Sequence, residues 1–168
     1  FMVMSATNFG LHFLSFTKRS LKYYLSNDEL KLFLSTILII VLISTLTLYI
    51  KEGFTIDESI RYGFFQTISI VTTTGFTIEP LSALGGSVGF LIFIVAFIGA
   101  CSGSVGGGIK VWRILLLFKV GFSNITKIMH PNAISSVKLN GEKIVSAQIE
   151  AVFSFVAIYI SFFLLFMF

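Results

Sequence analysis

The sequence has little cysteine and little charge. Its 168 residues include one cysteine, Cys101, which excludes an internal disulfide and any zinc site built from several cysteines. Charged residues make up 12% of the chain, against about 25% in soluble domains. Together with a hydrophobic content of 55%, this scarcity of charge nearly excludes a water-soluble enzyme. The 20 Phe, 5 Tyr and 1 Trp also exclude a disordered chain, because so apolar a composition would collapse in water.

Three segments are long enough to cross a bilayer, which requires about 20 helical residues. Residues 32–50 carry no charge, residues 87–120 begin within a long uncharged stretch, and residues 144–168 carry one acidic residue. Residues 1–16 have the composition of the end of a preceding helix. Because the chain starts at Phe1 and ends inside an apolar run, we expect it to be a piece of a longer membrane protein.

Basic residues are concentrated in two regions, 17–31 and 110–143, and the second of these contains the connecting segment 121–143. The connection over residues 51–86 instead holds four acidic residues against two basic ones. An excess of Lys and Arg marks the cytoplasmic side of a membrane protein. We therefore expect both basic segments to be cytoplasmic linkers, and the spans to run alternately outward and inward between them.

The outer connection, residues 51–86, is too apolar for an ordinary loop. Thr55 and Glu58 have the spacing of a capping box, and apolar residues follow at helical spacing. A helix over residues 58–70 would be ~20 Å long, which is short of a bilayer. Residues 71–77, Val-Thr-Thr-Thr-Gly-Phe-Thr, favour extended backbone because β-branched side chains crowd a helix. This order of elements is typical of a cation pore: a span, a short re-entrant helix, an extended segment and a second span.

Conduction of a cation through hydrocarbon requires oxygen atoms in place of its hydration shell. Backbone carbonyl groups of an extended Thr/Gly segment can supply them in a row, and threonine hydroxyl groups can add further ligands. The candidate filter residues are Thr72, Thr73, Thr74, Gly75 and Phe76, with K⁺ expected at Thr73, Thr74 and Gly75. In a soluble protein the same residues would be taken for a strand and a glycine turn. The flanking spans and the short helix favour the filter.

A second constellation lies inside the second span, where five of the ten residues 99–108 are glycine. As one continuous helix, residues 87–120 would extend ~51 Å, well beyond the ~30 Å hydrocarbon core. We therefore predict two half-helices joined by a flexible gating loop that lies below the filter. The candidate loop residues are Gly99, Ser102, Gly103, Ser104, Gly106, Gly107, Gly108 and Lys110.

Two alternatives exist for the function of this glycine-rich segment, a nucleotide-binding loop and a helix-packing surface. A Walker A loop needs Gly-Lys-Ser/Thr, whereas here Ile109 separates the last glycine from Lys110. Close helix packing is a stronger alternative than nucleotide binding. Gly99 with Gly103, and Gly103 with Gly107, form GxxxG pairs. Packing alone, however, does not require three successive glycines. For Lys110 itself, the ordinary interpretation is a marker of the cytoplasmic interface, and a role in repelling cations at a closed gate is the alternative.

With these residues assembled, the sequence resembles the Trk/Ktr family of bacterial potassium-uptake subunits. The resemblance rests on the filter residues Thr72–Phe76 and on the glycine-rich run Gly99–Arg113, and residues 7–9, Thr-Asn-Phe, support it. It covers essentially the whole chain. One departure is that Val105 follows Ser104, where the family usually has Ser-Thr.

The resemblance implies an all-α integral membrane fold of four linked repeats around one pore. Each repeat has an outer helix, a pore helix, a filter loop and an inner helix. Residues 1–16 would end one repeat, residues 32–120 would form a complete repeat, and residues 144–168 would begin the next one, truncated. Within the complete repeat the parts would be outer helix 32–50, pore helix 58–70, filter 71–77 and a broken inner helix 87–120.

The resemblance further implies potassium uptake through a multi-pass protein of the cell inner membrane, with Na⁺ left open as a second ion. Family members pair as homodimers in the lipid bilayer and associate with a cytosolic nucleotide-binding regulatory subunit that acts on the inner-helix loop. No catalytic residue, cofactor or nucleic-acid partner is expected. Whether transport is channel-like or coupled as symport is left open.

Two rival functions remain. A subunit of a tetrameric potassium channel would carry one repeat per chain. A non-conducting membrane scaffold would use its glycines only to pack helices, and would tolerate substitution of Thr73 and Gly75. An enzyme is least favoured, because the sequence offers no cluster of His, Cys or carboxylate residues in a plausible site.

Overall fold

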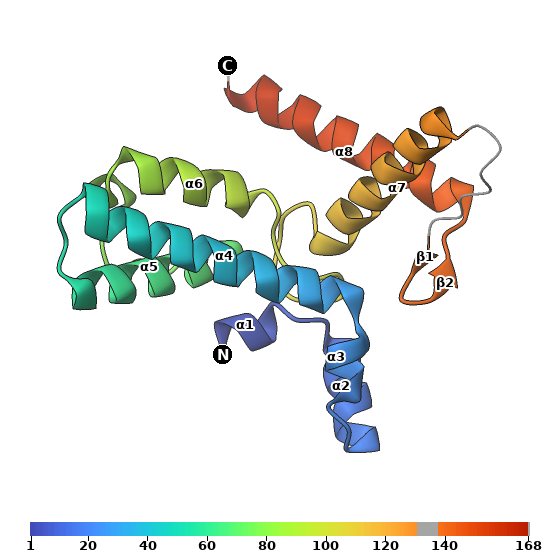
Figure 1. Ribbon diagram of the computed structural model, residues 1–168, viewed down its shortest axis with the longest axis horizontal. Helices are drawn as coiled ribbons and strands as arrows, with labels where there is room; N and C mark the ends of the chain where they lie inside the picture. Colours follow the sequence, from blue (N-terminus) through green and yellow to red (C-terminus); the bar gives the residue numbers. More distant parts are fainter. Residues whose placement is uncertain (131–137, 168) are drawn as a thin grey trace. The chain divides into compact units, whose positions relative to one another are not determined.

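The computed structural model describes residues 1–130 and 138–167, and these are mainly helical (Figure 1). The chain divides into two compact units, Phe1–Val111 and Trp112–Phe168, which are described separately. The first unit contains α1 (Met2–Ser5), α2 (Phe9–Lys18), α3 (Lys22–Ser26), α4 (Asp28–Lys51), α5 (Ile56–Val71), the 3-10 turn η1 (Leu81–Leu84) and α6 (Gly86–Ala96). The second contains most of α7 (Val111–Met129), β1 (Lys138–Leu139), β2 (Glu142–Lys143) and α8 (Ser146–Met167).

Helix α4 is the longest element of the first unit. Its 24 residues correspond to ~36 Å, enough to cross a bilayer. Its N-terminus is capped by the Asn27 side chain, which accepts a hydrogen bond from the Leu30 N–H at 2.9 Å. Within the described part of the chain, α4 and α8 are the two helices with the length and hydropathy of a membrane span.

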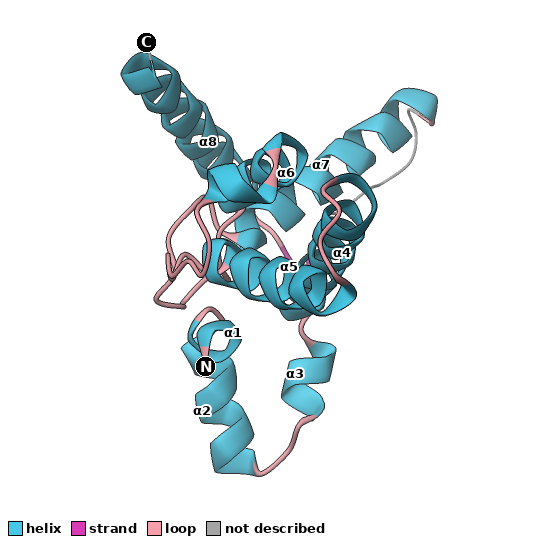
Figure 2. Cartoon of the chain, turned by 90° about the vertical axis from the view of Figure 1, so that its left-hand side faces the viewer, coloured by secondary structure: helices cyan, strands magenta, loops and turns pink. Residues whose placement is uncertain are grey.

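Helix α5 folds back along α4, and both pack against α6 (Figure 2). The predicted capping box is confirmed. The Thr55 hydroxyl accepts from the Glu58 N–H at 3.4 Å, and the Glu58 carboxylate accepts from the Thr55 N–H at 3.1 Å. Close approach of the two helices depends on Gly63, where a Cβ would lie 2.5 Å from the Thr45 hydroxyl oxygen. The Ser44 and Thr67 hydroxyl oxygens lie 3.0 Å apart, and this hydrogen bond joins α5 to α4.

The predicted break in the inner helix is confirmed. Helix α6 ends at Ala96 and α7 begins at Val111, with non-helical backbone between them. Helix α7 continues to Met129, beyond the expected end at residue 120. The continuation has a local cause, because Phe118, Phe122 and Ile125 extend the apolar helical spacing past that point.

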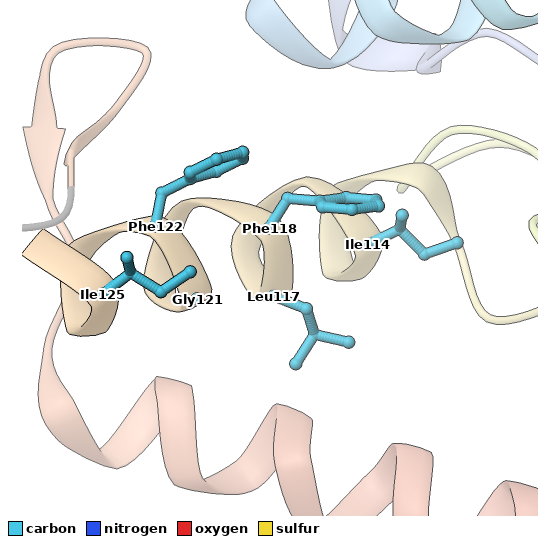
Figure 3. Close-up of a pocket in the computed structure, with 6 residues that line it drawn as sticks. All are labelled: Ile114, Leu117, Phe118, Gly121, Phe122 and Ile125. Atoms are coloured by element: carbon cyan, nitrogen blue, oxygen red, sulfur yellow. The ribbon is translucent and has the colours of Figure 1, made fainter.

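The second unit has a small core of Leu116, Val120, Leu139 and Val152. Strands β1 and β2 form an antiparallel hairpin whose turn residues, Asn140 and Gly141, both have positive φ. The opposite face of α7 carries an apolar groove of about 380 Å³ (Figure 3), lined by Ile114, Leu117, Phe118, Gly121, Phe122 and Ile125. Part of the predicted linker, residues 131–137, and the last residue of the predicted span 144–168 lie outside the described residues.

Candidate functional site

The candidate filter begins where α5 ends, and its N–H groups turn back toward that helix. The Thr73 N–H donates to the Ile70 carbonyl at 2.9 Å. The N–H groups of Thr74 and Gly75 both donate to the Ser69 carbonyl, at 2.8 and 3.2 Å. In a trans peptide the N–H and C=O groups point in opposite directions. The carbonyl groups of Thr72, Thr73 and Thr74 therefore point away from the end of α5.

The carbonyl groups of this loop have no hydrogen-bond donor among the described residues. Among the hydrogen bonds of the described residues, the carbonyl oxygens of Thr72–Phe76 accept none. The backbone of this loop is unusual, because Thr73 has φ 57° and Gly75 has φ 82°. A left-handed conformation is costly for a residue with a Cβ, and such strain is concentrated at functional sites. The loop thus offers a short row of free peptide oxygens in a fixed, locally strained conformation.

The threonine hydroxyl groups have protein partners. The Thr72 hydroxyl donates to the Ile68 carbonyl at 2.7 Å, and it lies 2.7 Å from the Thr74 hydroxyl. The Thr73 hydroxyl accepts from the Gly107 N–H at 2.8 Å. The sequence suggested these hydroxyl groups as additional ion ligands. In the structure these hydroxyl groups bond to the protein and hold the loop.

The glycine-rich loop folds tightly on itself. Gly99 has φ 71°, and a Cβ there would lie 2.2 Å from the Gly107 carbonyl oxygen. A Cβ at Gly106 would lie 2.4 Å from the Ala100 Cβ and 3.2 Å from the Thr72 carbonyl oxygen. The glycines therefore allow two stretches of backbone to meet each other and the base of the filter. Flexibility is not their main contribution in this conformation.

The predicted filter and the predicted gating loop are in direct contact. Thr73 and Gly107 are joined by their hydrogen bond, and the Lys110 ammonium group turns back to donate to the Gly106 carbonyl. Lys110 also has φ 82°, so its backbone is strained where α7 is about to begin. Inside the loop, the Ser104 hydroxyl donates to the Cys101 carbonyl at 2.6 Å.

Segment 5–9 forms the other side of this site. The Cys101 N–H donates to the Ala6 carbonyl at 3.0 Å, and the Phe9 N–H donates to the Gly103 carbonyl at 3.1 Å. At Gly103, an added Cβ would lie 3.1 Å from the Asn8 side chain. A cavity of about 610 Å³ lies beside these elements, lined by Phe1, Met2, Met4, Ser5, Phe9, His12, Phe16, Thr74 and Phe76. The filter residues Thr74 and Phe76 thus face open space bounded by α1 and α2.

One residue of this assembly is not evident from the sequence. Glu29, in the first turn of α4, is 4% exposed, and its carboxylate accepts a hydrogen bond from the Ser102 N–H. Its position in a basic segment next to Asp28 indicated a solvated linker. Its partner is 73 positions away in the chain, so no local pattern could reveal the contact.

The chain is similar to known cation transport proteins. The family described as "TrkH: Cation transport protein" matches residues 1–168. The Trk system potassium uptake protein TrkH of Halomonas elongata is 33% identical over 165 residues, covering 98% of this chain and 34% of that protein. The protein of the same name from Salmonella typhimurium is 39% identical over 160 residues, covering 95% of this chain and 33% of that protein.

Among solved structures, the crystal structure of the potassium transporter TrkH from Vibrio parahaemolyticus matches with a TM-score of 0.91 and 32% sequence identity. The match covers 98% of this chain and 36% of that chain. This chain therefore spans about a third of the length of the relatives it matches. The match over the whole chain, together with the structural similarity, also supports the all-α membrane fold. The chain belongs to the TrkH family of cation transport proteins.

Proposed function

We propose that the protein containing this chain takes up potassium across the bacterial inner membrane, with Thr72–Phe76 as part of its selectivity filter. The observation that carries this proposal is the row of carbonyl groups after α5, which point away from the helix and accept no hydrogen bond among the described residues. Relatives named as potassium uptake proteins support potassium as the ion.

The chemistry follows from the cost of removing a cation from water. Carbonyl oxygens replace the hydration shell, and several must surround the ion at once. The loop Thr72–Phe76 supplies oxygens from one side, so the remaining oxygens come from other parts of the longer protein. The negative end of the α5 dipole also favours a cation near Thr73, Thr74 and Gly75. Sodium is the competing ion.

The glycine-rich loop, residues 99–110, is proposed as the gate. It lies against the base of the filter through the bond between Thr73 and Gly107, so an ion leaving the filter inward requires this loop to move. On the resemblance to the Trk/Ktr family, the protein is a homodimer, and a cytosolic nucleotide-binding regulatory subunit acts on this loop.

The experiment that tests the filter uses the full-length parent in a bacterial strain deficient in potassium uptake. Gly75 has φ 82° and open space around a Cβ, so Gly75→Ser acts through backbone strain alone, about 1–2 kcal/mol. We expect the parent to restore growth at limiting potassium and Gly75→Ser to lose the preference for K⁺ over Na⁺ in ion uptake.

Gly53 offers a matched control. It also has a left-handed φ, 71°, and open space around a Cβ, but it lies in the turn after α4. Gly53→Ser should therefore carry similar strain and leave ion preference unchanged. A Gly75→Ser variant with the uptake and selectivity of the parent would place the filter elsewhere. A well-expressed parent that fails to restore growth would favour the scaffold.

A further inference from the structure

Glu29 is a carboxylate buried at the start of a membrane helix. It is 4% exposed, although acidic side chains are almost never fully buried unless they are paired. Its Oε1 accepts the N–H of Ser102, which lies in the middle of the glycine-rich loop. A hydrogen bond to an ionised acceptor is about twice as strong as one between neutral groups. The contact is therefore a strong point of attachment for the loop.

The contact from Glu29 differs from the other contacts of the loop in the element that provides it. Segment 5–9 holds the loop through its backbone, at Cys101, Gly103 and Val105. The filter holds it through Thr73. Glu29 instead belongs to α4. Helix α4 packs against α5 and is joined to it by the hydrogen bond between the Ser44 and Thr67 hydroxyl groups. The loop is thus tied to the same rigid pair of helices that carries the filter.

We propose that Glu29 is a positioning residue that latches the glycine-rich loop against the filter. The inference rests on the proposed role of this loop as a gate. Ser102 and Gly107 lie on the two arms of the loop, and the loop folds back on itself where Ala100 donates to the Gly107 carbonyl at 3.3 Å. Holding Ser102 therefore helps to hold Gly107 beneath Thr73. Release of the Glu29 contact lets both arms move away from the filter.

Reach and charge can be separated at this position. Glu29→Gln keeps a carbonyl oxygen at the same distance from the backbone, so it can still accept the Ser102 N–H without charge. Glu29→Asp keeps the charge but is one methylene shorter, and it loses the contact. Glu29→Ala removes both the charge and the acceptor. Ser102→Ala keeps the backbone N–H and is the matched control on the other side of the bond.

Cys101 provides a readout independent of transport. It is the neighbour of Ser102 and is 1% exposed, so it reacts with a thiol reagent only when the loop opens. We would measure its rate of labelling by a small maleimide in the full-length parent, with any other cysteines replaced. Potassium uptake and the preference for K⁺ over Na⁺ would be measured on the same variants.

We expect Glu29→Ala and Glu29→Asp to label roughly tenfold faster than the parent, from the usual strength of hydrogen bonds to charged groups. Glu29→Gln keeps the acceptor but loses the charge that strengthens the bond, so its labelling rate should lie between those of the parent and Glu29→Ala. Ser102→Ala should stay close to the parent rate. Ion preference should be unchanged throughout, and uptake should rise in the fast-labelling variants because the gate opens more often.

Three results would overturn the latch. The first is an unchanged labelling rate in Glu29→Ala. The second is fast labelling in Glu29→Gln with a normal rate in Glu29→Asp, which would assign the effect to charge alone. The third is fast labelling accompanied by loss of ion preference, which indicates general unfolding. A parent that carries no potassium would refute the proposed function instead, and the labelling rates would still decide whether Glu29 holds the loop.

Discussion

At the scale of single residues, Gly99 and Gly107 belong to one loop but should differ sharply in their tolerance of a methyl group. A Cβ at Gly99 would meet the Gly107 carbonyl oxygen at 2.2 Å with φ at 71°, whereas a Cβ at Gly107 would meet nothing within 4 Å. We expect Gly99→Ala to destabilise the protein by about 2–4 kcal/mol through steric overlap and left-handed strain. Gly107→Ala should be nearly neutral, because it keeps the N–H that Thr73 accepts.

The measurement is the thermal unfolding of the full-length parent and the two variants in detergent. Equal losses of stability in both variants would show that the loop needs glycine for flexibility at every position. That result would count against the folded conformation in which Gly99 contacts Gly107.

Some features of the fold and of this site can be predicted from the sequence, and others cannot. The capping box at Thr55 and the helix break after Ala96 were predictable, because spacing, composition and bilayer thickness are local or simple constraints. Glu29 was not, since its burial depends on a loop far along the chain. The protein partners of the threonine hydroxyl groups were also hidden, because a hydroxyl group in the sequence does not indicate what it will bond.

At the scale of elements, α5 is the helix whose start is most clearly fixed by side chains. The Thr55 hydroxyl accepts the Glu58 N–H, and loss of such an N-cap oxygen typically costs about 1 kcal/mol. In Thr55→Ala we therefore expect hydrogen exchange in the first turn of α5 to accelerate about fivefold. Thr55→Ser keeps the hydroxyl and should exchange like the parent. Equal exchange in Thr55→Ala and the parent would mean that packing alone holds the helix start.

The same cap should depend on pH. Hydrogen bonds from the Thr55 side chain, and then from its backbone, lower the pKa of the Glu58 carboxyl below 4.5. A lowered pKa means that the carboxylate form favours the folded cap. Its contribution is therefore present above pH 4.5 and is lost as the pH falls below that value. Glu58→Gln should remove this pH dependence from the exchange of the first turn, whereas a dependence that survived would belong to another group.

At the scale of the whole molecule, α6 is too short to cross a bilayer by itself. Helix α6 has 11 residues and is ~17 Å long, about half of the ~30 Å hydrocarbon core. If residues 87–120 cross the membrane as the sequence predicts, the crossing needs residues beyond α6, including the glycine-rich loop. Non-helical backbone at such depth is tolerated only where it is buried in protein or lines water. The many contacts of the loop with segment 5–9 and the filter meet this requirement.

This crossing predicts opposite exposure for two lysines. Lys51, at the end of α4, and Lys127, in the last turn of α7, are both solvent-exposed. In the full-length parent, with any cysteines other than the buried Cys101 replaced, Lys51→Cys should react with a membrane-impermeant thiol reagent in intact cells. Lys127→Cys should react only after permeabilisation, because the excess of Lys and Arg predicts that this segment is cytoplasmic. Labelling of both positions in intact cells would show that α6 and α7 re-enter the membrane from outside instead of crossing it, and the gate could not then lie on the inner side of the filter.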